Sequence, residues 1–316
     1  MIRTFRYNIT ASDLPATVHQ YLRQKGYSRH ILASLKPHPD AVLRNGGHVW
    51  FSDRLVSGDV LTVTVRDAVS SVNIVPAPVP FSIVYEDEDL MVINKPAGVS
   101  IHPAINHPAD TLANGIAQLY RERGVPYVFR CINRLDRDTT GLLILANNVF
   151  SASLLEPALQ RREISRTYLA VAEGTVPQEG KIDLPIGRKE ASLIERCVDP
   201  EHGDRAVTHF RTLQVFSGEK LPASAAFSLV ELRLETGRTH QIRVHMAATG
   251  HPLIGDTLYN PRYQILQPQS DDEIRRQALH AWKLSFVHPI TKEAMHFTAP
   301  LPGDLLQLVK CGSPAG

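Results

Sequence analysis

The stretch that decides the fold lies near the middle of the chain and reads Asn133-Arg134-Leu135-Asp136-Arg137-Asp138-Thr139-Thr140-Gly141-Leu142-Leu143-Ile144-Leu145-Ala146. Its second half, from Gly141 to Ala146, is an unbroken apolar run of strand length, which predicts a buried β-strand. Its first half places two aspartates and two arginines directly before that strand. Functional groups often stand on loops that a rigid element holds in place. Charge alone, however, is equally compatible with a solvated surface turn.

Patterns on both sides of this stretch predict an α+β domain built around a large mixed, mainly antiparallel sheet flanked by helices and loops. Residues 83–85 and 90–93 form an expected hairpin, residues 168–172 form another buried strand, and residues 230–234 alternate as in a half-buried strand. Helical spacing predicts helices over 111–123, 149–162 and 240–249. The last of these is expected to be capped by Thr239 and ended by Gly250.

The N-terminal part of the chain predicts a separate small α/β domain. Two helices are expected over 14–26 and 28–36, followed by a hairpin around Asn45-Gly46 and a strand over 58–65. Residues 1–70 carry nine Lys/Arg against five Asp/Glu, a balance of +4. The prolines at 76, 78 and 80 favour an extended connector. We therefore divide the chain into a small domain (1–70), a linker (71–80) and a large domain (81–316).

The bulk composition excludes several classes of protein. The 316 residues are 43% hydrophobic but contain no apolar run long enough to span a membrane, and the N-terminus lacks a signal-peptide pattern, so a cytoplasmic location is expected. Three cysteines without CxxC or CxxH spacing predict neither a disulfide framework nor a zinc site. His240 and His245 do not have the spacing of a metal-binding pair, and no phosphate-binding glycine loop is present.

The run Arg-Leu-Asp-x-x-Thr-Thr-Gly at 134–141 resembles the signature of the RluA type of RNA pseudouridine synthases. Further runs similar to this family follow in the same order over about residues 81–302: 85–98, 166–170, 203–208, 236–245, 251–256, 279–281 and 288–289. The small N-terminal pattern over about 10–66 resembles an RNA-binding domain shared by a ribosomal protein and several RNA-modifying enzymes. One departure is Asn133, where the family commonly has a histidine; an amide can hydrogen-bond but cannot titrate.

The resemblance implies a site for isomerising uridine to pseudouridine. It implies that Asp136 is the catalytic carboxylate, that Arg243 is its ion-pair partner, and that Tyr168 stacks on the target base. Arg134 is the expected wedge that fills the space of an extruded base. Further substrate contacts are expected from Asn133, Arg137, Thr140, His240 and Gln241. The turn Lys95-Pro96-Ala97-Gly98 is expected to shape the rim of the site.

The expected reaction breaks the bond from ribose to nitrogen and makes a bond from ribose to carbon 5 of the same base, so no cofactor or metal is implied. Whether Asp136 forms a covalent adduct or promotes a glycal intermediate stays open. The expected partner is RNA, ribosomal RNA rather than transfer RNA, and the chain is expected to be a monomer. The alternatives are a catalytically silent RNA-binding protein and a hydrolase using Asp136 and Asp138 as paired carboxylates.

Overall fold

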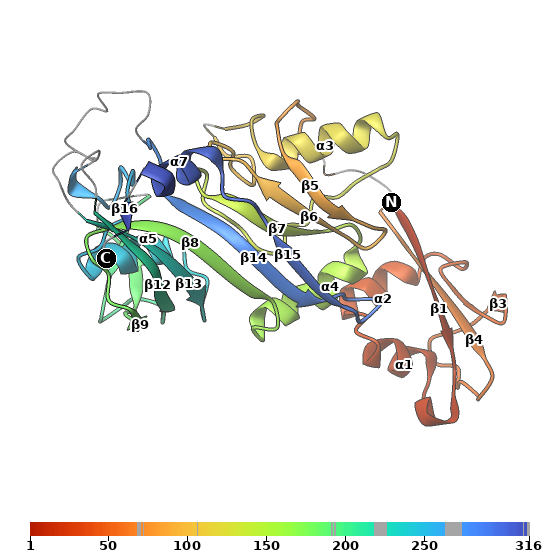
Figure 1. The fold of residues 1–316 in the computed structure, drawn as a ribbon. Coiled ribbons are helices and arrows are strands. Elements are labelled where there is room, and N and C mark those ends of the chain that lie inside the picture. Colours follow the sequence, from red (N-terminus) through yellow and green to blue (C-terminus); the bar gives the residue numbers. More distant parts are fainter. Residues whose placement is uncertain are drawn as a thin grey trace.

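The computed structural model describes residues 1–67, 71, 73–105, 107–190, 192, 194–217, 226–262, 274–311 and 313–314. A small sheet with its helices forms one end of the molecule, and a long sheet extends from it to the other end (Figure 1). Among the described residues, no helix is long and apolar enough to cross a bilayer.

The small N-terminal unit is a four-stranded antiparallel sheet, in the order β1-β4-β2-β3, packed against two helices. Its elements are β1 (Ile2–Asn8), a 3-10 turn (Ala11–Asp13), α1 (Val18–Gln24), α2 (Arg29–Leu35), β2 (Val42–Arg44), β3 (Gly47–His48) and β4 (Val60–Arg66). Its hydrophobic core joins both helices to the inner face of the sheet, which confirms the predicted small α/β unit.

Local sequence explains most of these elements. Ser28 caps α2 by accepting a hydrogen bond from the backbone of Ile31 at 3.2 Å. Asn45 and Gly46 both have positive φ, as a tight hairpin between β2 and β3 requires. The first helix is shorter than predicted, because Thr17 caps it and Pro15 stands outside. Strand β1, which pairs with β4 along its whole length, was not predicted.

The large sheet contains ten strands among the described residues and is mainly antiparallel, as predicted. Its order is β16-β12-β13-β8-β14-β7-β6-β5, with β15 beside β14 and β9 beside β12, and its one parallel pair joins β14 to β7. The strands are β5 (Ser82–Glu86), β6 (Leu90–Lys95), β7 (Thr140–Ala146), β8 (Ser165–Glu173), β9 (Glu179–Asp183), β12 (Val207–Ser217), β13 (Phe227–Leu234), β14 (Leu279–Val287), β15 (Ala294–Thr298) and β16 (Ser313–Pro314). A separate two-stranded sheet pairs β10 (Ile186–Arg188) with β11 (Arg196–Val198).

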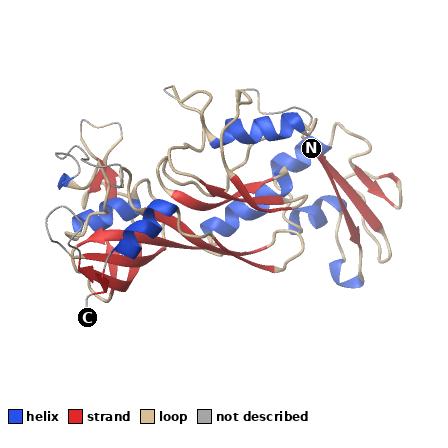
Figure 2. Cartoon of the chain, turned by 45° about the horizontal axis from the view of Figure 1, so that its top comes forward, coloured by secondary structure: helices blue, strands red, loops and turns tan. Residues whose placement is uncertain are grey.

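Helices cover both faces of this sheet (Figure 2). Alternate residues of β6 separate the two faces: Met91 and Ile93 pack with α3 (Leu112–Glu122), whereas Leu90 and Val92 pack with α4 (Val149–Gln160). The other helices are α5 (Gln241–Ala248), which packs beside β8 and β13, and α7 (Gly303–Cys311). The predicted helices over 111–123 and 149–162 are confirmed within a few residues.

Two predictions about individual residues were wrong. Thr239 does not cap α5; His240 occupies the N-cap position with a left-handed φ of 58°. Strand β13 is not half-buried throughout, because Glu231 is 6% exposed and forms ion pairs with Arg211 and Arg233. The predicted end of α5 is confirmed, since Gly250 has a φ of 83°.

The small sheet is joined to the large one by both apolar and ionic contacts. Phe150 of α4 belongs to the core of the small unit, where its ring stacks on Tyr27 at 3.9 Å. Arg3 of β1 donates two hydrogen bonds, of 3.0 and 2.9 Å, to buried Asp89. These contacts make β1 part of the support of the β5–β6 turn.

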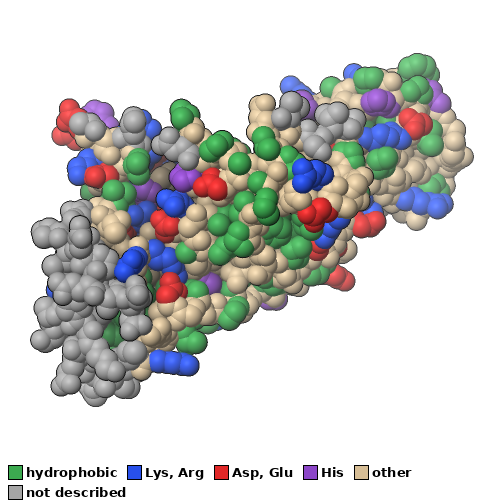
Figure 3. All heavy atoms as spheres, turned by 90° about the horizontal axis from the view of Figure 1, so that it is seen from above, with side chains coloured by type: hydrophobic (Ala, Val, Ile, Leu, Met, Phe, Trp, Pro, Cys, Tyr) green, Lys and Arg blue, Asp and Glu red, His purple; other side chains and the backbone are tan. Residues whose placement is uncertain are grey.

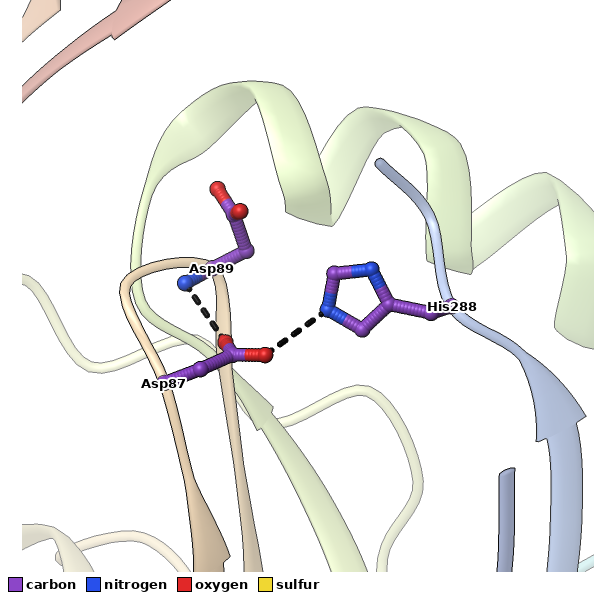
Figure 4. Close-up of side chains that lie close together, drawn as sticks. All are labelled: Asp87, Asp89 and His288. Atoms are coloured by element: carbon purple, nitrogen blue, oxygen red, sulfur yellow. Dashed lines mark hydrogen bonds and ion pairs between the residues drawn. The ribbon is translucent and has the colours of Figure 1, made fainter. Parts of the chain in front are cut away.

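The same turn gathers Asp87, Asp89 and His288 (Figure 4). Asp87 accepts hydrogen bonds from His288 at 2.9 Å and from the backbone of Asp89 at 2.7 Å. Asp89 in turn accepts from Arg3 and from Asn148. Because protein donors already occupy both carboxylates, we interpret this cluster as a structural joint between the turn, α4 and the two sheets.

The parallel contact between β7 and β14 depends on Gly141. Its φ is 111°, and a Cβ atom at this position would lie 2.2 Å from the carbonyl oxygen of Ala281. Only glycine therefore allows β14 to lie beside the start of β7, directly after the polar loop that contains Asp136.

We predict that Gly141→Ala lowers the free energy of unfolding by roughly 3 kcal/mol, the sum of an unfavourable φ and a backbone clash. Urea denaturation followed by circular dichroism measures it. Gly303→Ala is the matched control, since no atom lies within 4 Å of its Cβ position, and it should be nearly neutral. Equal free energies of unfolding for the two variants would contradict this prediction, because they would show that β14 moves away from the added Cβ atom without loss of stability.

Candidate active site

A cavity of about 620 Å³ opens where the loop after residue 132, strand β8 and the start of α5 meet. Its volume is in the range of sites that hold small organic ligands. Apolar side chains, including Leu135, Ile164 and Leu279, form part of its lining. Seven of the predicted site residues also line it: Asn133, Arg134, Asp136, Tyr168, His240, Gln241 and Arg243.

Buried side chains hold the backbone of the loop that contains Asp136. Lys95, fully buried, donates hydrogen bonds of 2.8, 2.8 and 2.7 Å to the carbonyls of Pro96, Val99 and Arg137. Burial lowers the pKa of Lys95 to about 7, while three carbonyl acceptors match the three donors of its charged form. Arg276 also donates to the carbonyl of Asp138 at 3.1 Å. The position of Asp136 is thus set by the backbone contacts of its neighbours.

Asp136 and Arg243 form an ion pair inside the cavity, and a second carboxylate fixes the arginine. Arg243 donates from Nη1 to Oδ2 of Asp136 at 3.2 Å. Its Nε and Nη2 donate to the two oxygens of Asp256 at 2.7 and 2.8 Å. Burial acts to lower the pKa of Arg243, but the hydrogen bonds and charge of Asp256, with the charge of Asp136, raise it above its ordinary value. Arg243 is therefore a permanent cation with a fixed orientation.

His240 faces the same oxygen of Asp136. Its Nδ1 lies 2.7 Å from the hydroxyl of Tyr259, and its Nε2 lies 3.9 Å from Oδ2 of Asp136. The Tyr259 hydroxyl already accepts a hydrogen bond from the backbone of Arg196 at 2.9 Å, so its own proton can be donated to Nδ1 of His240. Burial lowers the pKa of His240, which favours the neutral ring. When Nδ1 accepts from Tyr259, the neutral ring carries its proton on Nε2, the nitrogen nearer to Asp136.

These contacts make the two oxygens of Asp136 unequal. Oδ2 accepts from Arg243 and faces His240, whereas Oδ1 has no hydrogen-bond partner in the described part of the chain. The side chain is 25% exposed, against 8% for Arg243. Oδ1 is therefore the oxygen available to a molecule in the cavity.

Tyr168 of β8 forms another wall of the cavity and is 4% exposed. Burial raises the pKa of its phenol, partly opposed by neighbouring Arg166. The ring is therefore neutral at physiological pH, which suits stacking against a flat base better than it suits action as a free phenolate.

Arginines surround the mouth of the cavity. Exposed Arg134 donates to the hydroxyl of Thr239 at 2.8 Å, a contact that holds it across the opening. The other arginines lining the cavity, apart from Arg243, are Arg162, Arg166 and Arg238. This arrangement favours a polyanionic ligand.

Four of the predicted substrate contacts form hydrogen bonds within the protein. Thr140 is buried beside His280, at 2.8 Å, and Arg137 donates to the carbonyl of Gly98; neither lines the cavity. Gln241 uses both ends of its amide on Thr208, Val207, Thr236 and Arg238. Asn133 accepts from the backbone of Ile144 at 2.9 Å and is 4% exposed. Asn133 and Gln241 still line the cavity, whereas Thr140 and Arg137 do not, and contact of these four residues with the substrate stays a prediction.

Sequence reasoning missed two residues that complete the site, Asp256 and Tyr259. Both follow α5 in a turn where Asp256 also accepts from the backbone of Leu258 and Tyr259, at 3.0 and 3.1 Å. The run at 251–256 was noted, but nothing in its pattern shows that its aspartate contacts Arg243. Asp138, by contrast, does not line the cavity, which leaves the paired-carboxylate hydrolase without its second group.

Comparison with known proteins agrees with this geometry. A family model described as RNA pseudouridylate synthase matches residues 89–248. The chain is 43% identical to an uncharacterised RNA pseudouridine synthase, YjbO, of Bacillus subtilis, over 93% of this chain and 98% of that protein. It is 40% identical to the ribosomal large subunit pseudouridine synthase D of Neisseria meningitidis, over 85% of this chain and 71% of that protein.

A solved structure, human RNA pseudouridylate synthase domain containing 1, matches with a TM-score of 0.58 and 29% identity, covering 75% of this chain and 89% of that one. The fold, the family match and the relatives agree along most of the sequence. This chain belongs to the RluA family of RNA pseudouridine synthases, and it is an isomerase that acts on RNA.

Proposed function

We propose that this enzyme isomerises uridines of large-subunit ribosomal RNA, with Oδ1 of Asp136 acting on the ribose of an extruded nucleotide. The observation that carries the proposal is the asymmetric environment of Asp136 in the cavity, where Arg243 holds Oδ2 and Oδ1 has no hydrogen-bond partner among the described residues. A carboxylate in a partly apolar cavity would otherwise tend to take up a proton, and the adjacent guanidinium opposes this.

In the proposed reaction, the bond from ribose carbon 1′ to base nitrogen 1 breaks, and its electron pair goes to the base. Asp136 either adds to carbon 1′ or takes a proton from the ribose to give a glycal. The base turns and carbon 5 bonds to carbon 1′, while the bond from Asp136 to carbon 1′ breaks or, on the glycal route, the ribose regains its proton. Carbon 5 then loses its hydrogen as a proton, and nitrogen 1 takes up a proton. No electrons or groups leave the nucleoside, so the sum is an isomerisation.

The walls of the cavity supply the other requirements. Extruding a base from a folded RNA costs a few kcal/mol. Arg134 is exposed at the mouth, where its planar guanidinium can fill the vacated space. Neutral Tyr168 can stack on the extruded base and keep it beside Asp136 while it turns.

The preference for ribosomal RNA is supported by the relative from Neisseria meningitidis, whose name states a large ribosomal subunit substrate. The relative YjbO carries no such statement, so transfer RNA is the second candidate. We further propose that residues 1–70 form a basic RNA-binding domain joined to residues 81–316 by the segment 71–80, and that the chain acts as a monomer in the cytoplasm.

We predict that Asp136→Asn lowers the single-turnover rate by roughly 10³-fold or more, because an amide has no negative oxygen to offer the ribose. The rate is measured as release of tritium from carbon 5 of uridine in transcribed ribosomal RNA. Asp138→Asn is the matched control, since Asp138 does not line the cavity, and its rate should stay within about tenfold of wild type. A fully active Asp136→Asn enzyme would rule out this mechanism.

We predict that Asp256→Asn lowers the rate at saturating RNA by about 10- to 100-fold, because Arg243 loses the carboxylate that orients it. Breaking this buried pair should also cost about 3 kcal/mol of stability. Glu231→Gln is the control, because it weakens a buried ion pair outside the cavity. If both variants lose stability but neither loses rate, Asp256 has no role in positioning.

Mapping of pseudouridine across total RNA, in cells with and without the gene, tests the choice of substrate. Sites that vanish should lie in large-subunit ribosomal RNA and should return with the wild-type gene but not with Asp136→Asn. Loss confined to transfer RNA would select the second candidate, and the absence of any lost site would contradict both.

A further inference from the structure

The small domain carries a groove of about 350 Å³ that the proposed reaction does not use. Trp50, in the turn after β3, stands at this groove and is 67% exposed. Tryptophan is highly buried on average, because its ring is a large apolar surface, so an exposed tryptophan beside an apolar groove offers a surface on which a ligand can stack. The buried side chains of Leu35, Val42 and Val49 form the apolar part of the lining.

The exposure of Trp50 does not result from a loose loop. Its backbone N–H donates to the carboxylate of Asp53 at 2.9 Å, and its carbonyl accepts from the backbone of Asp53 at 3.0 Å. The next carbonyl, of Phe51, accepts from the backbone of His19 at 2.9 Å. The ring of His48 contacts the Trp50 ring edge to face, with centroids 4.8 Å apart. The indole is therefore held in place and open to a ligand.

The charges around the groove favour an anionic ligand. Exposed Lys36, His38 and His48 line it, and no carboxylate is among its described lining residues. The balance of residues 1–70 is +4. Figure 3 shows hydrophobic, histidine and basic side chains, with some acidic ones, on the end of the molecule that the small domain forms.

We propose that this groove binds an unpaired base of the RNA substrate, which stacks on Trp50 while Lys36 lies near the adjoining phosphate. The inference rests on RNA being the substrate, but not on Asp136 or on which RNA is modified. Every base has a flat π-face that can stack on an exposed aromatic ring, and a basic neighbour suits the backbone that accompanies it. The small unit and α5 lie at opposite ends of the molecule (Figure 1), so this base is not the target uridine.

A protein partner could also cover an exposed tryptophan. RNA is favoured because the lining carries the cation of Lys36 and no carboxylate among the described residues, and because the enzyme already acts on RNA. If RNA occupies the groove, RNA added to the purified enzyme should affect Trp50. If a protein partner occupies it, RNA alone should leave Trp50 unchanged.

The fluorescence of Trp50 tests the proposal directly. The chain has two tryptophans, so Trp282→Phe leaves Trp50 as the only emitter. Titration with a single-stranded RNA oligonucleotide at low salt should quench this emission until the site saturates. A duplex of the same length should quench it far less, because its bases are already stacked. Unchanged emission, while filter binding shows that the single strand is bound, would overturn the proposal and leave a protein partner as the occupant.

Substitutions provide the second test. Trp50→Ala should weaken binding of the single strand about tenfold, and Trp50→Phe should retain most of it. Val56→Ala is the matched control, because Val56 is 59% exposed on the same unit but does not line the groove. On full-length ribosomal RNA, Trp50→Ala should raise KM and leave the rate at saturation unchanged.

Equal binding by Trp50→Ala and wild type would contradict the groove's role even if Asp136→Asn abolishes the reaction. Conversely, weaker RNA binding by Trp50→Ala would support the groove's role even if Asp136→Asn stayed active. The two proposals can therefore fail separately.

Discussion

Arg243 donates two hydrogen bonds to Asp256 and one to Asp136, and the rest of the cavity is arranged around this shared guanidinium. A lone buried arginine would be costly to desolvate, and a lone carboxylate in the same cavity would tend to become neutral. Asp256 balances the buried charge of Arg243 and fixes its direction, and Arg243 in turn opposes protonation of Asp136. The enzyme thereby keeps one oxygen of Asp136 occupied and the other available.

Three features of the fold position Asp136 and Arg243. The parallel contact of β7 with β14 sets the end of the loop before Gly141, and Lys95 and Arg276 hold the carbonyls of the loop itself. Helix α5 begins at a left-handed His240, so that the histidine and Arg243 both face Asp136. A backbone conformation that is unusual for a non-glycine residue is thus placed at the functional site, where such strain is commonly found.

The sequence predicted five strands of the large sheet, β5, β6, β7, β8 and β13, because apolar or alternating runs mark them, but it did not predict β9, β12, β14, β15 or β16. The Asp136–Arg243 pair was expected from the family resemblance, and the structure shows it. The sequence did not predict Asp256 as the partner of Arg243, since that contact depends on how the turn after α5 folds back. It predicted that Thr140 and Gln241 contact the substrate, and it gave no sign that both also form hydrogen bonds that brace the protein around the site. A motif marks residues that build a site as strongly as those that touch the ligand. Strand β1 was missed because its partner, β4, lies more than fifty residues away.

The shared core around Phe150 shows why the small domain is better studied by point substitutions than by deletion, since removing it would expose apolar surface on α4. The central claim concerns the two oxygens of Asp136. The most direct measurement is a crystal structure of the enzyme with an RNA whose target uridine carries fluorine at carbon 5, which prevents loss of a proton there. We expect Arg243 to remain bound to Asp256 and to Oδ2 of Asp136, and Oδ1 of Asp136 to be the carboxylate oxygen nearest the ribose. An Arg243 that has left Asp136 for a phosphate, or a ribose distant from Oδ1, would contradict it.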